Sequence, residues 1–152
     1  MFIRHRCTLV LLFAGLFVLN HAFAGTGLAR AAVDWLGSLG IGLDTLAGML
    51  PFALLASNTI GNVPAVVMLL AAQPGWGEGV LQALALTTTL AGNFLLVGSI
   101  ANLIVAERAA REGVRFGFAE HARAGVPMAL ASLALAGAWL LATGRIAWSG
   151  GA

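Results

Sequence analysis

Two polar clusters interrupt a strongly apolar sequence, and both contain groups that can bind small ions. The first runs through Ser57-Asn58-Thr59 to Asn62 and Pro64, with Gly61 between them. Gly61 can adopt a positive φ, and Pro64, which lacks an N–H, suits the first turn of a new helix. The free N–H groups and the positive dipole end of a helix N-terminus attract anions. The break over 57–64 is therefore a candidate anion site.

The second cluster lies at Gly92-Asn93 and continues to Ser99 and Asn102. A helix interrupted at Gly92 would leave backbone carbonyls without partners, and the side-chain oxygens of Ser99 and Asn102 lie about one helical turn apart. Carbonyl and side-chain oxygens are the ligands that an unwound membrane helix offers to a cation such as Na⁺. This cluster therefore predicts a cation site that complements the anion site.

The same residue types also have a purely structural interpretation. Small and polar residues let membrane helices approach closely and hydrogen-bond to each other. The run Thr87-Thr88-Thr89 is expected to bond to its own helix, and the alternative is that it lines the same cavity as the two clusters. His121 is predicted to lie on a solvated cytoplasmic surface, together with the arginines near it.

Composition indicates a membrane protein. Of the 152 residues, 60% are hydrophobic and only 9% are charged, which leaves too little polar surface for a soluble domain. The length allows about three to five membrane segments. A single cysteine and three dispersed histidines argue against a disulfide framework, a metal cluster or an enzyme active site, and no cofactor is expected. The sequence has no stripe of basic residues of the kind that binds nucleic acids.

The first apolar segment, 8–24, follows two arginines and is long enough to cross a membrane with its flanks. It also fits a cleaved signal peptide, because it ends in Ala22-Phe23-Ala24. The next apolar segment, 44–73, consists of two short arms around the first polar cluster. Each arm is half the length of a spanning helix, so we expect a re-entrant hairpin.

The remaining segments complete an all-α integral membrane fold. We expect a discontinuous transmembrane helix over 79–105, an amphipathic cytoplasmic loop or surface helix over 106–124, and a last transmembrane helix over 126–142. The whole chain then forms a single membrane domain, 1–152, with about three spanning helices and one hairpin surrounded by membrane lipids.

The arginines predict the orientation. A cytoplasmic N-terminus and a cytoplasmic 106–124 loop place six of the eight arginines inside, and leave Arg30 and Arg145 outside. This distribution follows the positive-inside tendency of the plasma (inner) membrane, and it places the C-terminus outside.

Three stretches together resemble the ion transporter superfamily, which includes citrate transporter-like, dicarboxylate:sodium symporter and arsenite-pump-like permeases. They are the segment 57–66 (SNTIGNVPAV), the segment 90–107 (LAGNFLLVGSIANLIVAE) and the segment 11–19 (LLFAGLFVL). The resemblance covers nearly the whole chain. It is more specific for the superfamily than for a substrate, and it favours a retained helix over a signal peptide at 8–24.

The resemblance implies a fold of two inverted repeats, each with a re-entrant hairpin and a broken helix. It implies transport of a small organic or inorganic anion by symport with Na⁺ or H⁺ as the coupling ion. By this likeness the substrate residues are Ser57, Asn58, Thr59 and Asn62, and the cation residues, where Na⁺ would bind, are Gly92, Asn93, Ser99 and Asn102.

The chain departs from that superfamily in length, because only the C-terminal repeat is recognisable. The chain is then either a fragment of a longer permease or a partial permease that needs a partner with the N-terminal repeat, or a second copy of itself. The alternative is a small accessory or degenerate membrane protein that does not transport. A third alternative is a secreted protein whose segment 8–24 is removed.

Overall fold

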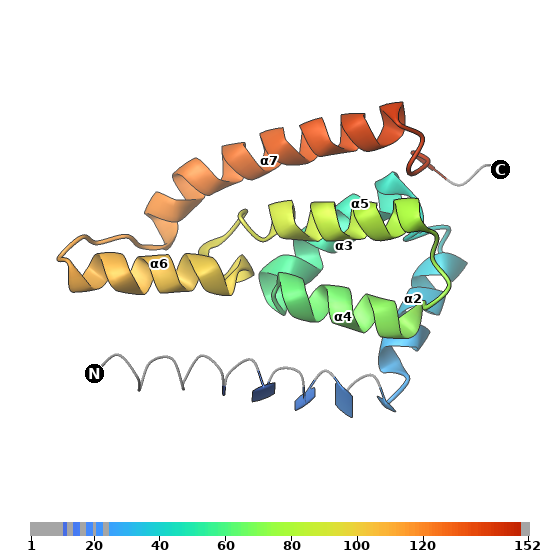
Figure 1. Cartoon of the computed structure of the whole chain (residues 1–152), viewed down its shortest axis with the longest axis horizontal. Helices are drawn as coiled ribbons and strands as arrows, with labels where there is room; N and C mark the ends of the chain where they lie inside the picture. The colour runs from blue at the N-terminus through green and yellow to red at the C-terminus, as the bar shows by residue number, and fades with distance from the viewer. Residues whose placement is uncertain (1–10, 12–13, 16–17, 20, 23–24, 150–152) are drawn as a thin grey trace.

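The computed structural model is all-helical, and it describes residues 11, 14–15, 18–19, 21–22 and 25–149. The expected transmembrane helix over 8–24 lies mostly outside these residues. Figure 1 shows α7, α5 and α4 lying roughly along the long axis of the molecule, with α7 above α5 and α4 below it. The elements are α2 (Leu28–Ser38), α3 (Leu46–Thr59), α4 (Asn62–Ala72), α5 (Glu78–Ala91), the short 3-10 helix η1 (Leu96–Gly98), α6 (Ile100–Arg111) and α7 (Phe118–Ala142).

Helices α3 and α4 form a helical hairpin within the segment 44–73. They are joined at Ile60 and Gly61, and Gly61 has a φ of 92°, a backbone conformation that favours glycine. Pro64 lies in the first turn of α4, where its missing N–H leaves no bond unmade. In Figure 1 the connection lies near the middle of the long axis, and both outer ends point the same way. Re-entry of this hairpin into a membrane stays a prediction.

The polar break in the hairpin is shorter than the sequence indicated. Ser57, Asn58 and Thr59 belong to the last turn of α3. The Asn58 side chain donates to Leu54 O at 2.8 Å, and the Thr59 hydroxyl donates to Leu55 O at 2.8 Å. Bonds to the preceding turn let short polar side chains remain in a helix, so these residues extend α3.

Helices α5 and α6 lie one after the other in the region of the expected discontinuous helix, 79–105. The interruption covers residues 92–99 and includes η1. Ser99 ends it by capping α6, because its hydroxyl oxygen accepts a hydrogen bond from Ala101 N at 3.3 Å. Figure 1 shows α6 continuing along the long axis beyond the end of α5.

The segment 106–124 is mostly helical, which is the second of the two forms expected for it. Helix α6 continues to Arg111, supported by an ion pair between Glu107 and Arg111 at 2.5 Å. Helix α7 begins at Phe118 rather than near Val126, because the Glu120 carboxylate accepts from Gly117 N at 3.1 Å and so satisfies an N-terminal donor. The connection between the two helices is therefore confined to 112–117.

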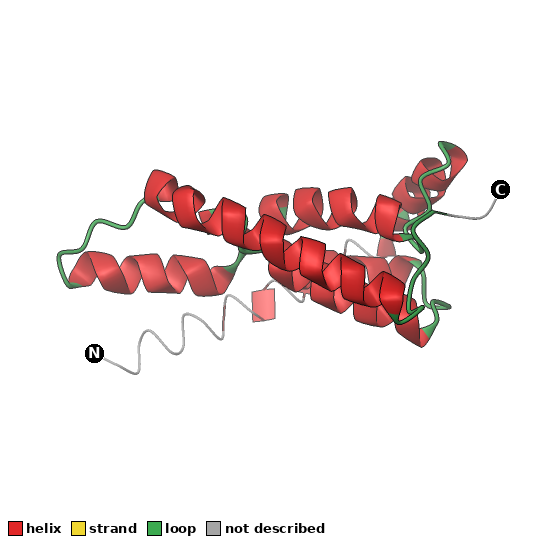
Figure 2. Cartoon of the chain, turned by 90° about the horizontal axis from the view of Figure 1, so that it is seen from above, coloured by secondary structure: helices red, strands yellow, loops and turns green. Residues whose placement is uncertain are grey.

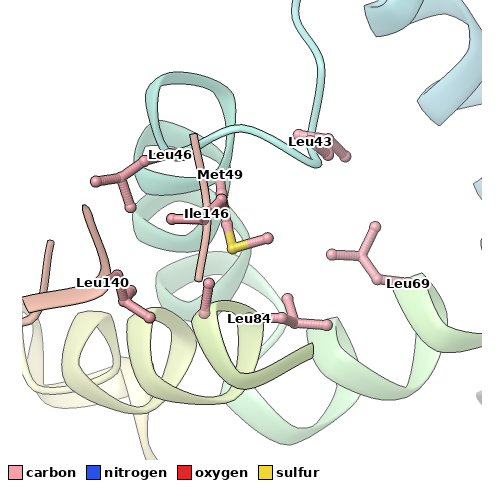
Figure 3. Close-up of a cluster of buried hydrophobic side chains, with 8 residues drawn as sticks. Leu43, Leu46, Met49, Leu69, Leu84, Leu140 and Ile146 are labelled. Atoms are coloured by element: carbon pink, nitrogen blue, oxygen red, sulfur yellow. The ribbon is translucent and has the colours of Figure 1, made fainter. Parts of the chain in front are cut away.

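The main hydrophobic core joins α3, α4, α5 and the end of α7. Figure 3 shows its side chains converging from these elements. The residues after α7 close it, because Ala147 O and Trp148 O accept hydrogen bonds from Leu46 N and Ala47 N at 2.9 Å. These bonds satisfy free N–H groups at the start of α3. The buried members of the core are Leu43, Leu46, Met49, Leu69, Ala83, Leu84, Leu140 and Ile146.

Truncating this core should destabilise the protein. Leu140 is fully buried, so Leu140→Ala should lower the free energy of unfolding by about 2–5 kcal/mol through lost contacts and a residual cavity. Leu135, on the same helix, is 73% exposed, and Leu135→Ala should change it by less than about 0.5 kcal/mol. Chemical denaturation of both variants in detergent measures the difference. Equal losses would contradict the assignment of the core.

Helix α7 meets the length and composition that crossing a membrane requires, alone among the helices of the described part. Helices α3 and α4 are apolar but shorter, so the layout with about three spans and a hairpin stays a prediction. Figure 2 shows α7 crossing obliquely over the other helices. Its outer face is apolar, as expected for contact with lipid. The exposed large side chains of α7 include Met128, Leu130, Leu135 and Trp139.

Candidate functional site

The C-terminal end of α5 is the centre of the candidate site. A helix that ends inside a protein leaves its last carbonyls without intrahelical partners, and each unpaired carbonyl is costly away from water. Three consecutive carbonyls at this end, those of Ala91, Gly92 and Asn93, accept hydrogen bonds from side chains of three different helices. The break in the α5–α6 segment is therefore held by its neighbours.

Each of the three donors comes from a different part of the sequence. Asn58 Nδ2 of α3 donates to Ala91 O at 2.9 Å, and Asn102 Nδ2 of α6 donates to Gly92 O at 3.1 Å. His121 Nε2 of α7 lies 3.1 Å from Asn93 O. Because a carbonyl oxygen can only accept, His121 must carry a proton on Nε2.

Among the three donors, the Asn58 side chain makes the most hydrogen bonds. Besides its bonds to Leu54 O and Ala91 O, its Oδ1 accepts from Leu95 N at 3.0 Å. The amide group and the carbonyl of this side chain are thus engaged with backbone of α3, of the last residue of α5 and of the break itself. The neighbouring Ser57 is fully buried, and its hydroxyl donates to Thr88 O at 3.1 Å. Together these residues attach α3 to the end of α5.

Glycines allow the backbone segments to approach closely here. A Cβ atom at Gly98 would meet Asn58 Oδ1 and would lie 2.7 Å from Gly92 O. A Cβ atom at Gly92 would lie 3.0 Å from Gly98 O and 3.5 Å from Asn62 Cβ. The start of α4, the end of α5 and η1 therefore meet at this point.

A pocket of about 250 Å³ lies between the first half of α4 and α5. Asn62 is at its edge and is half-buried, and Asn62 Oδ1 accepts from Val63 N at 2.9 Å. The positive dipole end of α4 is next to this pocket, although most of the lining is apolar. Its lining residues are Asn62, Val63, Val66, Val67, Ala85, Thr88 and Thr89.

The structure brings together five of the eight candidate residues. The residues that lie around the break are Asn58, Asn62, Gly92 and Asn102, together with the backbone of Asn93. The other three residues lie apart from this cluster. Ser57 is buried between α3 and α5, Thr59 is bonded only within α3, and Ser99 caps α6.

The threonine run behaves as expected, because Thr87, Thr88 and Thr89 each donate to the carbonyl four residues earlier in α5. The expectation for His121 was wrong. This side chain is only 9% exposed and contacts the break, instead of lying on a solvated surface.

The spacing of the residues in α7 contained a signal for His121. The buried positions of α7 recur mostly every four residues, and His121 is the first of them. A polar residue on the buried stripe of a helix needs an internal partner. The charged residues around His121 hid this signal. The buried stripe comprises His121, Gly125, Ala129, Leu133, Gly137 and Leu140.

Most of the chain is similar to membrane proteins of mycobacteria. It is 34% identical over 144 residues to a 46 kDa membrane protein of Mycobacterium leprae, and 34% identical over 144 residues to an uncharacterized transporter of Mycobacterium tuberculosis. Each alignment covers 86% of this chain and 33% of the relative. The chain thus spans about a third of the length of these curated relatives.

A third relative is a protein of Dictyostelium discoideum that carries the transporter name arsB. The identity is 42% over 79 residues, which cover 49% of this chain and 13% of that protein. No family model matches the chain, and no solved structure matches it. The similarities support a membrane transporter family at a coarse level.

Proposed function

We propose that this chain is the C-terminal part of an anion permease that moves a small anion together with Na⁺ or H⁺ across the plasma membrane. The observation that carries the proposal is the helix break at 92–99, where carbonyls from α5 meet the tip of the α3–α4 hairpin. Broken helices that meet in this way form the substrate and ion sites of secondary transporters. The similarity to proteins named as transporters supports the part of the proposal that concerns membrane transport.

The two ions would bind to opposite kinds of helix end. The carbonyls of Ala91 and Gly92 each have two lone pairs, and each accepts one hydrogen bond, from Asn58 and from Asn102 respectively, so each keeps a lone pair for a cation. A small cation such as Na⁺ suits this oxygen-rich end of α5. The anion suits the start of α4, where Asn62 borders the 250 Å³ pocket and the helix dipole is positive.

The proposed activity requires more protein than this chain. We propose that the site is completed by an N-terminal repeat carried by a partner, or by a second copy of the chain. The chain itself would need no resident cofactor and would not act as an enzyme. Citrate, dicarboxylates, sulfate and arsenite all remain candidates for the anion.

Reconstituted transport tests this proposal. The purified chain would be placed in proteoliposomes alone and together with the first-repeat half of a related permease, under a Na⁺ or H⁺ gradient. We expect gradient-dependent uptake of a radiolabelled anion only in the second preparation, because the buried break needs protein neighbours to form a pathway. Uptake by the chain alone would indicate a symmetric homodimer, and no uptake in either preparation would contradict the proposal.

A non-transporting accessory protein is the second candidate function. It is favoured by the complete engagement of the Asn58 amide, whose two N–H groups and carbonyl all bind backbone. A residue with no free donor contributes to structure without contacting an anion. An accessory protein would co-purify with a permease and alter its yield, while substitutions at Asn62 would leave the permease's affinity unchanged.

The orientation can be tested separately by cysteine labelling. On a Cys7→Ser background, Gly75→Cys in the α4–α5 connection should react with an impermeant reagent from outside. Glu112→Cys, in the connection between α6 and α7, should react only after permeabilisation. Both positions are exposed in the structure, so reactivity reports the side of the membrane. External labelling of Glu112→Cys would contradict a cytoplasmic 112–117 connection.

A further inference from the structure

We infer that His121 is a positioning residue for the break, and that it fixes the Asn93 peptide relative to α7. Its Nε2 lies 3.1 Å from Asn93 O, across 28 positions of sequence. The side chain is 9% exposed, so water competes little for this hydrogen bond. A role of His121 in shaping the cation site rests on the proposed function. Its role in ordering the break does not depend on that function.

Two neighbouring residues support the assignment. The ring of Phe116 contacts the imidazole edge to face, with ring centroids 5.9 Å apart and an angle of 82° between the planes. This contact limits the rotation of the imidazole. Gly125 lies one turn further along α7, and a Cβ atom there would lie 2.6 Å from Asn93 O and 2.9 Å from His121 Nε2. The absence of a side chain at Gly125 thus gives the carbonyl access to the histidine.

The hydrogen bond links α7 to the ion-site region by a route that Asn58 and Asn102 do not supply. Those two residues hold the carbonyls of Ala91 and Gly92 from α3 and α6. His121 holds the next carbonyl from α7, the helix with the clearest membrane-spanning character. A displacement of α7 would therefore move the Asn93 peptide, and with it the oxygens that face the proposed cation.

Hydrogen exchange of the full chain in lipid nanodiscs tests the positioning role directly. His121→Phe preserves an aromatic ring against Phe116 but removes the donor, and it should raise exchange of the amides over 93–98 about tenfold. His121→Gln keeps an N–H donor at a similar reach and should restore protection to within about twofold of the wild type. Ser132→Ala is the matched control, because that hydroxyl bonds only within α7.

Gly125→Ala provides a second variant that leaves the histidine in place. Its methyl group should force Asn93 O away from His121, so exchange over 93–98 should rise as in His121→Phe. Unchanged exchange in His121→Phe would overturn the inference. Equal loss of protection in His121→Phe and His121→Gln would also overturn it, because ring packing rather than the hydrogen bond would then order the break.

Binding of ²²Na⁺ to nanodiscs that hold the chain together with the first-repeat half of a related permease separates this inference from the proposed function. If the cation site exists, His121→Phe should raise the half-saturating Na⁺ concentration about fivefold or more, and His121→Gln should leave it within about twofold. Absence of Na⁺ binding by the wild type would contradict a Na⁺ site in the chain. In that case hydrogen exchange over 93–98 would still decide whether His121 orders the break.

Discussion

Replacement of Asn58 by alanine should lower the free energy of unfolding by about 2–4 kcal/mol, because it leaves buried backbone groups with fewer partners. The lost bonds include those to Ala91 O at 2.9 Å and from Leu95 N at 3.0 Å, which join α3 to the end of α5 and to the break. Denaturation in detergent measures the stability, and proteoliposome uptake with the partner half should be abolished as well.

Two further variants show which part of the Asn58 amide matters. Asn58→Asp keeps an acceptor for Leu95 N but places a carboxylate oxygen against Ala91 O, so it should be at least as damaging as alanine. Thr59→Val is the matched control on the same turn. Its hydroxyl bonds only to its own helix, and the expected change is below about 0.5 kcal/mol. A stable Asn58→Ala protein with normal uptake would remove Asn58 from the site.

The second large effect is expected for Gly98→Ala. The added methyl group would meet Asn58 Oδ1 and lie 2.7 Å from Gly92 O, so the hairpin tip and the break must move apart. Overpacking of this kind lowers the free energy of unfolding by about 1–3 kcal/mol, and the rigid backbone neighbour places this site at the upper end. Denaturation midpoints and uptake should both fall, because stability and site geometry depend on the same contact.

Gly37→Ala is the control for Gly98→Ala. Gly37 lies in α2 with no atom within 4 Å of the added methyl group, so alanine there should stabilise the helix by up to about 1 kcal/mol. The double variant Asn58→Ala with Gly98→Ala gives a further test. Because one obstacle to the methyl group is the Asn58 side chain, the two losses should differ from additivity by about 0.5–3 kcal/mol. Strict additivity would contradict a direct contact.

Local features of the sequence were sufficient to predict the helical composition and the places where helices are interrupted. The interruptions at Gly61 and Gly92 follow from residues that favour or tolerate a break, and Pro64 lies in the first turn of α4 for the same local reason. The extent of the helices was less predictable. The stretch 57–59 remained helical because the side chains of Asn58 and Thr59 bonded to the preceding turn. Helix α7 began early because the Glu120 carboxylate accepted a hydrogen bond from Gly117 N.

The sequence by itself determined that the chain is apolar, helical and interrupted by two polar clusters, since these properties depend on residue type and on spacing along one helix. Tertiary structure decided which polar groups meet. The three donors at the end of α5, Asn58, Asn102 and His121, come from helices whose rotation and approach depend on packing. His121 belongs to this set because α7 turns one stripe of small and apolar residues toward α5. Gly125 on that stripe leaves room for the carbonyl of Asn93. No local pattern in the sequence could have placed that carbonyl beside α7.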